Sequence, residues 1–295
     1  MSKLFPLLRL VNLTNIHLRF ARKHTFLLQH QSYSVSVRTN SQLISNHLNL
    51  LSQYNFHKPS IEEILKSNSA WNEISSTELK NTIEVLQSYQ FSVNDITDVF
   101  KSAADVCTIQ KNDLIDTLET WLTIQFSLDS LIDLLSSQPI LLKIDKEDIV
   151  ERIPTYLLIF NNNRNKLVLF LKICPEVMYE NFEDIVEKYN YIRHKMEIKP
   201  KEFLNSRVLI HDLNFIKTRH IFLERSGQYH YRTKDMSPIQ SLGNPTMNSI
   251  FDTSDKMFSE KIAKLSLLEY ETFCSYFTQE LAEEDDESDL SEEEN

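Results

Sequence analysis

The sequence predicts an all-α protein, a solenoid of helical repeats of about 35 residues. Three observations support this fold class: an internal period in the apolar residues, helical spacing within each period, and start and stop signals at the expected helix ends. The chain has 295 residues, of which 41% are hydrophobic and 10% aromatic. It is therefore long and apolar enough to bury a substantial core.

The period is clearest in three phenylalanines, Phe56, Phe91 and Phe126, which lie 35 residues apart. Each is followed nine residues later by a large apolar residue, and four residues beyond that comes the last marked position of the unit. This last position recurs, at spacings of 35, 35, 36 and 33, at Ser69, Ala104, Pro139, Pro175 and Val208. A single unit cannot bury its apolar face alone, so the five units are expected to stack into a solenoid.

Within a unit the apolar residues have helical spacing, as at Ile61, Ile64 and Leu65, so each unit is expected to contain two helices joined by short turns. Helix starts are predicted where a capping side chain precedes an acid by three positions. These pairs are Ser75 with Glu78, Ser92 with Asp95, and Asn181 with Asp184. Helix ends are predicted before Pro139 and Pro175, and Gly227 is expected to cap a helix that begins near Leu213.

Both ends of the chain differ from the repeats in composition. Residues 1–40 contain six Lys or Arg and no acid, whereas residues 283–295 contain nine acids and no base. The first segment is typical of a mitochondrial transit peptide, with an ordinary basic arm as the alternative; Arg9 interrupts the apolar run that a secretory signal requires. We therefore divide the chain into a transit peptide (1–40), a repeat domain with a C-terminal cap (41–282) and a disordered acidic tail (283–295), and expect it in the mitochondrial matrix. No run reaches the ~18 apolar residues of a membrane span.

The repeat domain contains one basic band. Residues 193–234 hold ten Lys or Arg against four acids, whereas residues 41–192 hold 12 against 22. Aromatic residues lie between these bases, a mixture suited to phosphate contact and base stacking, although a solvated helix face would also be charged. The candidate nucleic-acid contacts are Arg193, Lys195, Lys199, Lys201, Arg207, Lys217, Arg219, Arg225, Arg232 and Lys234. Arg219 has a structural alternative, an ion pair with an acid such as Glu224.

No catalytic pattern is found in the sequence. Its two glycines cannot supply the glycine-rich loops that hold nucleotide phosphates, and its nine histidines form no HExxH pair. The three cysteines are scattered and never paired as CxxC. We therefore expect a protein that is not an enzyme, with no metal and no cofactor.

Two proline-bearing repeat ends, "LLSSQPILL" and "FLKICPEVM", resemble the mitochondrial transcription termination factor (mTERF) family. The order "IKTRHIFLERSGQY", "NPTMNSIFDTSDKMFSEKIAKLSLLEYETF" and an acidic tail resembles one branch of that family. The resemblance covers residues 45–282, but the family's proline is replaced at Ser69, Ala104 and Val208, and residues 161–163 replace an expected aromatic.

The resemblance implies a left-handed half-ring that binds nucleic acid along a basic concave side. For this branch it implies a mitochondrial rRNA-binding adaptor that works with a Sun-domain rRNA cytosine methyltransferase, as a heterodimer, in assembling the large ribosomal subunit. A regulator of transcription termination that binds mitochondrial DNA, and a purely protein-binding scaffold, stay open as alternatives.

The C-terminal cap is the expected docking surface for the methyltransferase, because a terminal repeat has no following neighbour to cover its apolar face. The candidate partner-binding residues, in or beside an irregular link, are Leu242, Pro245, Ile250, Phe251 and Phe258. Ile262, Leu265 and Phe273 are instead expected to pack on the last repeat.

Overall fold

The computed structural model describes residues 37–232 and 242–292, with side chains described for 42–232 and 242–283. The chain divides into Met1–Asn40 and Ser41–Asn295. The predicted transit peptide lies outside the described residues apart from its last four, which begin helix α1. Every regular element within the described ranges is helical, as the sequence predicted, and no described helix is long and apolar enough to cross a membrane.

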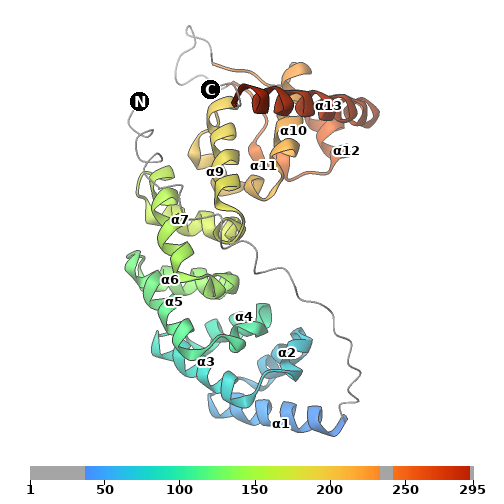
Figure 1. Cartoon of the computed structure of the whole chain (residues 1–295). Coiled ribbons are helices and arrows are strands. Elements are labelled where there is room, and N and C mark those ends of the chain that lie inside the picture. Colours follow the sequence, from blue (N-terminus) through green and yellow to red (C-terminus); the bar gives the residue numbers. More distant parts are fainter. Residues whose placement is uncertain (1–36, 233–241, 293–295) are drawn as a thin grey trace. The chain divides into compact units, whose positions relative to one another are not determined.

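The first four units each contain two α-helices and a short 3-10 helix (Figure 1). They are α1 (Val37–Gln53), α2 (Lys58–Ser67) and η2 (Ser69–Asn72); α3 (Ser76–Ser88), α4 (Val93–Ser102) and η3 (Ala104–Thr108); α5 (Lys111–Thr123), α6 (Leu128–Ser137) and η4 (Pro139–Lys143); α7 (Lys146–Ile159), α8 (Arg164–Ile173) and η5 (Pro175–Met178). Each 3-10 helix begins at a predicted last position of the repeat. The period is thus confirmed, but a unit holds three helices rather than two, because the chain after the second helix tightens into one 3-10 turn.

The later units depart from this plan. The fifth contains α9 (Phe182–Asn190), the π-helix η6 (Tyr191–Lys195) and the 3-10 helices η7 (Pro200–Asn205) and η8 (Val208–Ile210). After it come α10 (Leu213–Arg225), α11 (Met247–Phe251), α12 (Asp255–Met257), the π-helix η9 (Phe258–Ile262) and α13 (Leu267–Glu292). Helix α13 thus includes most of the segment for which the sequence predicted disorder. No proline or glycine follows Pro245, and glutamate is a good helix former, so the helix has no stop signal there.

Equivalent helices of successive units contact one another. The second helices contact one another in the order α2, α4, α6 and α8, and the series continues through η7 to α11. The short helices form a second series in the order η2, η3, η4, η5 and η8. Among the first helices, α3, α5 and α7 contact in order, and α9 contacts α10. Helices α10 and α11 therefore hold the places of the first and second helix in a sixth unit, joined by the long link 226–246.

A left-handed residue ends the first helix of each unit. Positive φ recurs at Asn55 (65°), Gln90 (68°), Gln125 (61°), Asn161 (53°), Glu197 (56°) and Gly227 (71°). Glycine holds this conformation without strain, and Gly227 is the predicted cap of α10. In the other five units asparagine, glutamine or glutamate holds it, so a chain with two glycines still turns sharply at each repeat.

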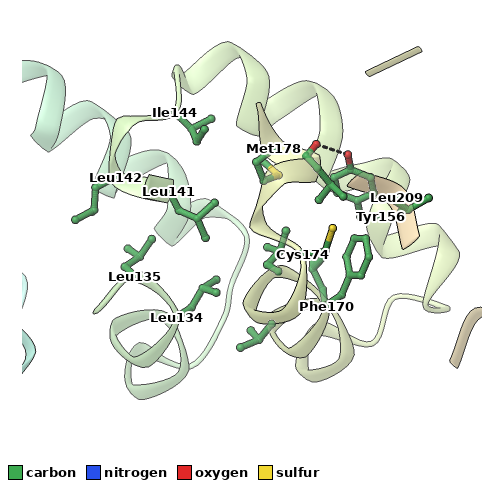
Figure 2. Close-up of a cluster of buried hydrophobic side chains, with 14 of the residues drawn as sticks. Leu134, Leu135, Leu141, Leu142, Ile144, Tyr156, Phe170, Cys174, Met178 and Leu209 are labelled. Carbon is green, nitrogen blue, oxygen red and sulfur yellow. Dashed lines mark hydrogen bonds between the residues drawn. The ribbon is translucent and has the colours of Figure 1, made fainter. Parts of the chain in front are cut away.

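Buried aliphatic and aromatic side chains link the units (Figure 2). Leu134 and Leu135 of α6 and Leu141 of η4 are fully buried, and Phe170 of α8 lies edge-on to Tyr156 with ring centroids 5.6 Å apart. The Tyr156 hydroxyl donates to the Val177 carbonyl at 2.7 Å. The predicted capping residues are also confirmed: the side chains of Ser75, Ser92 and Asn181 accept from the first turns of α3, α4 and α9.

Candidate nucleic-acid interface

One polar residue recurs on the inner side of each first helix. It lies at His47, Thr82, Thr117, Arg152, Lys188 and Arg219, spaced 35, 35, 35, 36 and 31 residues apart. In the last three units it is a cation that donates to a backbone carbonyl of its own unit: Arg152 to Val177 (3.0 Å) and Glu180 (2.6 Å), Lys188 to Leu209 (3.4 Å), and Arg219 to Thr253 (2.9 Å). We call these six residues the polar column. The column is hard to recognise in the sequence because its members are of three chemical types, although their spacing is regular.

Arg219 belongs to the polar column and is therefore not available to contact nucleic acid. Its side chain is 1% exposed, and its guanidinium donates to the Ile250 carbonyl and, at 2.7 Å, to the Asp255 carboxylate. The same group lies 4.5 Å from the ring centroids of both Phe215 and Phe258. The prediction for Arg219 was wrong because burial commits all of this charge to joining α10 to α11 and α12; the structural alternative holds, with Asp255 rather than Glu224 as the acid.

Three further cations of the basic band form ion pairs at the surface. Arg225 forms a two-bond pair with Glu280 of α13 (3.1 and 2.6 Å), Arg207 pairs with Glu176, and Lys201 lies 3.6 Å from Glu202. Each pair neutralises much of the charge that a phosphate would meet. Arg232 is exposed, and its backbone N–H donates to Glu197 at 3.4 Å. Lys234 lies outside the described residues.

The remaining cations are Arg193, Lys195, Lys199 and Lys217, and in the described part of the chain none of the four forms an ion pair. Three of them lie in residues 191–199, which we call the basic turn. Lys195 and Lys199 are exposed, and Arg193 and Lys217 are half-buried. In the described part of the chain, four of the ten predicted contacts are therefore paired with acids, and the cations of the basic turn and one neighbouring lysine are without an ion pair.

The basic turn owes its shape to a π-helix followed by a left-handed residue. Met196 N–H donates to the Tyr191 carbonyl (3.3 Å) and Ile198 N–H to the Ile192 carbonyl (3.2 Å). Ile192 and Met196 are buried, which anchors the turn at two points and leaves the three basic residues 193–195 between them. Single-turn π-helices are rare in proteins, and those that occur are frequently at functional sites.

A buried histidine fixes the turn against α10. His220 Nδ1 lies 2.8 Å from the Tyr191 hydroxyl, and His220 Nε2 lies 2.8 Å from the Tyr231 hydroxyl. Burial lowers the pKa of His220 to about 4, so the ring is neutral and has one donor and one acceptor. Burial and the charge of Glu224 raise the pKa of Tyr231 to about 12, so its hydroxyl stays protonated. The His220 ring therefore donates to one of the two tyrosine hydroxyls and accepts from the other.

The predicted partner-binding patch is largely core. Ile250, Phe251 and Phe258 are buried, which contradicts the prediction, while Leu242 and Pro245 are half-buried. The prediction failed because the sequence did not reveal a sixth unit, in which α11 occupies the place of the second helix. Ile262, Leu265 and Phe273 pack against the core as expected. The apolar side chains that the last helices do expose are Met257 (48%), Leu268 (71%) and Tyr276 (66%).

The structure places the cysteines apart and in apolar surroundings. Cys107 and Cys174 are buried free thiols, and burial raises the pKa of Cys174 to about 12, far from the thiolate form that a nucleophile requires. In the residues for which side chains are described, no group of three or more His, Cys, Asp or Glu is arranged to hold a metal ion.

The fold defines a helical-repeat protein, and in the described ranges the basic turn brings together three cations that form no ion pair. The mTERF family model matches residues 16–259, most of the chain, and the protein therefore belongs to the mTERF family, as the repeats predicted. It is similar to the mouse (Mus musculus) protein "Transcription termination factor 4, mitochondrial", with 29% identity over 107 residues. That match covers 36% of this chain and 30% of the mouse protein.

Proposed function

We propose that this protein is a mitochondrial adaptor that binds ribosomal RNA and positions a Sun-domain rRNA cytosine methyltransferase during assembly of the large ribosomal subunit. It regulates translation through this role and catalyses no reaction itself. The observation that carries the proposal is the basic turn, with unpaired cations at Arg193, Lys195 and Lys199 in a chain of net charge −11. Membership of the mTERF family and the similarity to a mitochondrial factor support the location and the class of ligand.

The small size of the cationic surface favours RNA with unpaired bases over long duplex DNA. Duplex affinity depends on neutralising many phosphates, and most described cations outside the turn are paired, as Lys143 is with Asp105 and Lys146 with Asp116. RNA loops offer unstacked bases that aromatic side chains bind. Tyr189, beside Arg193 in the same helix end, is half-buried and can supply such a contact.

A DNA-binding regulator of transcription termination is the second candidate. The name of the mouse relative, a transcription termination factor, favours it. The two candidates share the fold and the basic turn, and they differ in the nucleic acid that is bound.

Crosslinking in isolated mitochondria, followed by sequencing of the attached nucleic acid, separates these candidates. The proposal predicts large-subunit rRNA in a few discrete positions, lost in a variant with Gln at Arg193, Lys195 and Lys199. Recovery of mitochondrial DNA instead would establish the second candidate. Recovery of neither would leave a purely protein-binding scaffold.

The methyltransferase is proposed to dock on the outer side of α12 and α13, where Met257, Leu268 and Tyr276 are exposed. Exposed aromatic and aliphatic anchors of this kind dominate protein interfaces. Leu268→Asp with Tyr276→Asp is expected to abolish co-purification of the methyltransferase while RNA binding is retained. Leu169→Asp, on α8 and also half-exposed, is the control; equal loss in the control would remove this surface from the proposal.

A further inference from the structure

An apolar cleft lies between α5 and α7, far along the chain from the basic turn. Its volume is about 290 Å³. The lining residues are Thr120, Thr123, Ile124, Gln125, Ile149, Val150, Ile153, Pro154, Leu157 and Arg164. Arg164 donates from Nε to the Ile124 carbonyl at 2.7 Å, which holds its guanidinium at one side of the cleft, and the rest of the lining is mainly apolar.

The helix α7 exposes more apolar surface along this cleft than a solvated helix requires. Val150 is 64% exposed and Leu158 is 50% exposed, and Pro154 between them is exposed as well. Positions 150, 154 and 158 are four residues apart, so they form a single stripe. Of this stripe, Val150 and Pro154 line the cleft.

Pro154 adds an unusual acceptor to this stripe. It lies in the interior of α7, and because proline has no N–H, the carbonyl of Val150 lacks the donor that an ordinary helix would supply. A backbone carbonyl beside an apolar surface favours a partner that brings its own donor.

Acidic residues border the stripe on its solvent side. Glu147 and Glu151 are exposed, and among the described residues neither forms an ion pair. The nearest lysine in sequence, Lys146, is committed to Asp116 of α5 at 3.0 Å. The cleft thus combines an apolar lining, unpaired carboxylates and a carbonyl without its usual donor.

We propose that this cleft is a docking site for a basic amphipathic helix of a partner protein. The apolar face of that helix covers Val150, Pro154 and Leu158, while its lysines or arginines pair with Glu147 and Glu151 and one of them donates to the Val150 carbonyl. Helix-in-groove recognition uses this combination of apolar anchors and charged edges. The surface is separate from the basic turn, so the protein can hold a basic protein segment and nucleic acid at once.

The next unit supplies a matched control. Residues 147–151 and 183–187 have the same sequence, EDIVE, in the first helices of consecutive units. In α9, however, the position of Pro154 is taken by Asn190, which has the N–H that proline lacks. Glu183→Gln with Glu187→Gln therefore removes the same charges from the same helical positions without touching the cleft.

Fluorescence anisotropy with the full chain tests the proposal. The probe is a labelled helical peptide of about 18 residues with leucines along one face and lysines on the other, compared with the same peptide carrying glutamates in place of lysines. The lysine peptide is expected to bind, and the glutamate peptide is not. Val150→Gln, and separately Glu147→Gln with Glu151→Gln, should each weaken binding by about tenfold or more, whereas the Glu183/Glu187 variant should change it less than about twofold.

Equal binding of both peptides, or equal loss in the Glu183/Glu187 variant, would overturn the proposal, because either result means that the cleft does not select the helix. Val150 is a surface residue, so a circular dichroism spectrum matching the wild type is expected for Val150→Gln. A concentration-dependent dimer in sedimentation that Val150→Gln dissolves would assign the cleft to a second copy of this chain instead.

Discussion

Helices α7 and α9 share the same five residues, EDIVE, from their second position onward, and they end in different structures. Both bury the central isoleucine of EDIVE, Ile149 and Ile185, each 1% exposed, and both place a cation of the polar column immediately after the shared sequence. Beyond that point α7 stays α-helical around Pro154, whereas α9 changes to the π-helix of the basic turn.

The difference shows which side of a repeat is constrained. The inner side must bury apolar residues and satisfy the carbonyls of the short helix, so it keeps its pattern from unit to unit. The outer side is not constrained in this way. In these two units, α7 lines an apolar cleft and α9 leads into the basic turn. We therefore expect function in this fold at outer positions that differ between equivalent units.

The largest expected effect is on the polar column. Arg152→Leu removes the arginine's hydrogen bonds to the carbonyls of Val177 and Glu180, the first of which keeps its bond from Tyr156. It also leaves Asp148, 3.3 Å from Arg152 in the native protein, without its partner. We expect a loss of about 3 kcal/mol in the free energy of unfolding, measured by urea denaturation. Lys188→Leu, which removes one 3.4 Å contact, should cost about 1 kcal/mol or less. An equal loss of unfolding free energy in both variants would contradict this, because it would mean that Arg152 and Lys188 stabilise their units equally.

The second effect is a pH dependence of stability that arises from His220 of α10, the residue that holds the basic turn after α9. The pKa of His220 is lowered to about 4 from 6.5, so the unfolded chain binds more protons than the folded chain between these values, and stability falls as pH falls through that window. Between pH 7 and pH 5, His220 is expected to lower the free energy of unfolding by about 2 kcal/mol. His220→Gln, which can still bond to both tyrosines, should flatten the profile by this amount in urea denaturation at each pH. A profile parallel to that of the wild type would contradict the buried neutral ring.

A smaller effect is expected at Pro154. Pro154→Ala restores the N–H donor to the Val150 carbonyl and should raise the free energy of unfolding by about 1 kcal/mol, since proline's lower unfolded-state entropy offsets part of the gain. Asn190→Ala, at the equivalent position of α9, should change stability less because no donor is restored there. Thermal unfolding of the two variants measures this difference. If Pro154→Ala is less stable than the wild type, the proline does not destabilise α7.

The sequence predicted the repeat period, the helix caps and the family because these depend on local spacing and on single residues. Gly227 and the capping serines Ser75 and Ser92 each act through neighbours within a few positions. The third helix of each unit was missed because a 3-10 turn has no apolar period of its own, and the sixth unit was missed because the link 226–246 breaks the spacing.

Prediction of the interface was limited for a different reason. A count of basic residues cannot separate Arg219, which is buried, from Lys217, two residues away and half-exposed. The pairing of Arg225 with Glu280 joins residues 55 positions apart, which local sequence does not reveal. Burial and pairing within the chain account for four of the ten predicted contacts, Lys201, Arg207, Arg219 and Arg225.

The central claim is that the basic turn, and not the polar column or the paired cations, contacts nucleic acid. The most direct test is the salt dependence of affinity for single-stranded RNA from the large-subunit rRNA, measured for wild type and for a variant with Gln at Arg193, Lys195 and Lys199. Each lost phosphate contact should lower the slope of log affinity against log salt by about 0.7, so the triple variant should lose about 2 units. The control, Gln at the paired surface lysines Lys101, Lys143 and Lys172, should keep the wild-type slope. An unchanged slope in the first variant, or an equal loss in the control, would contradict the account.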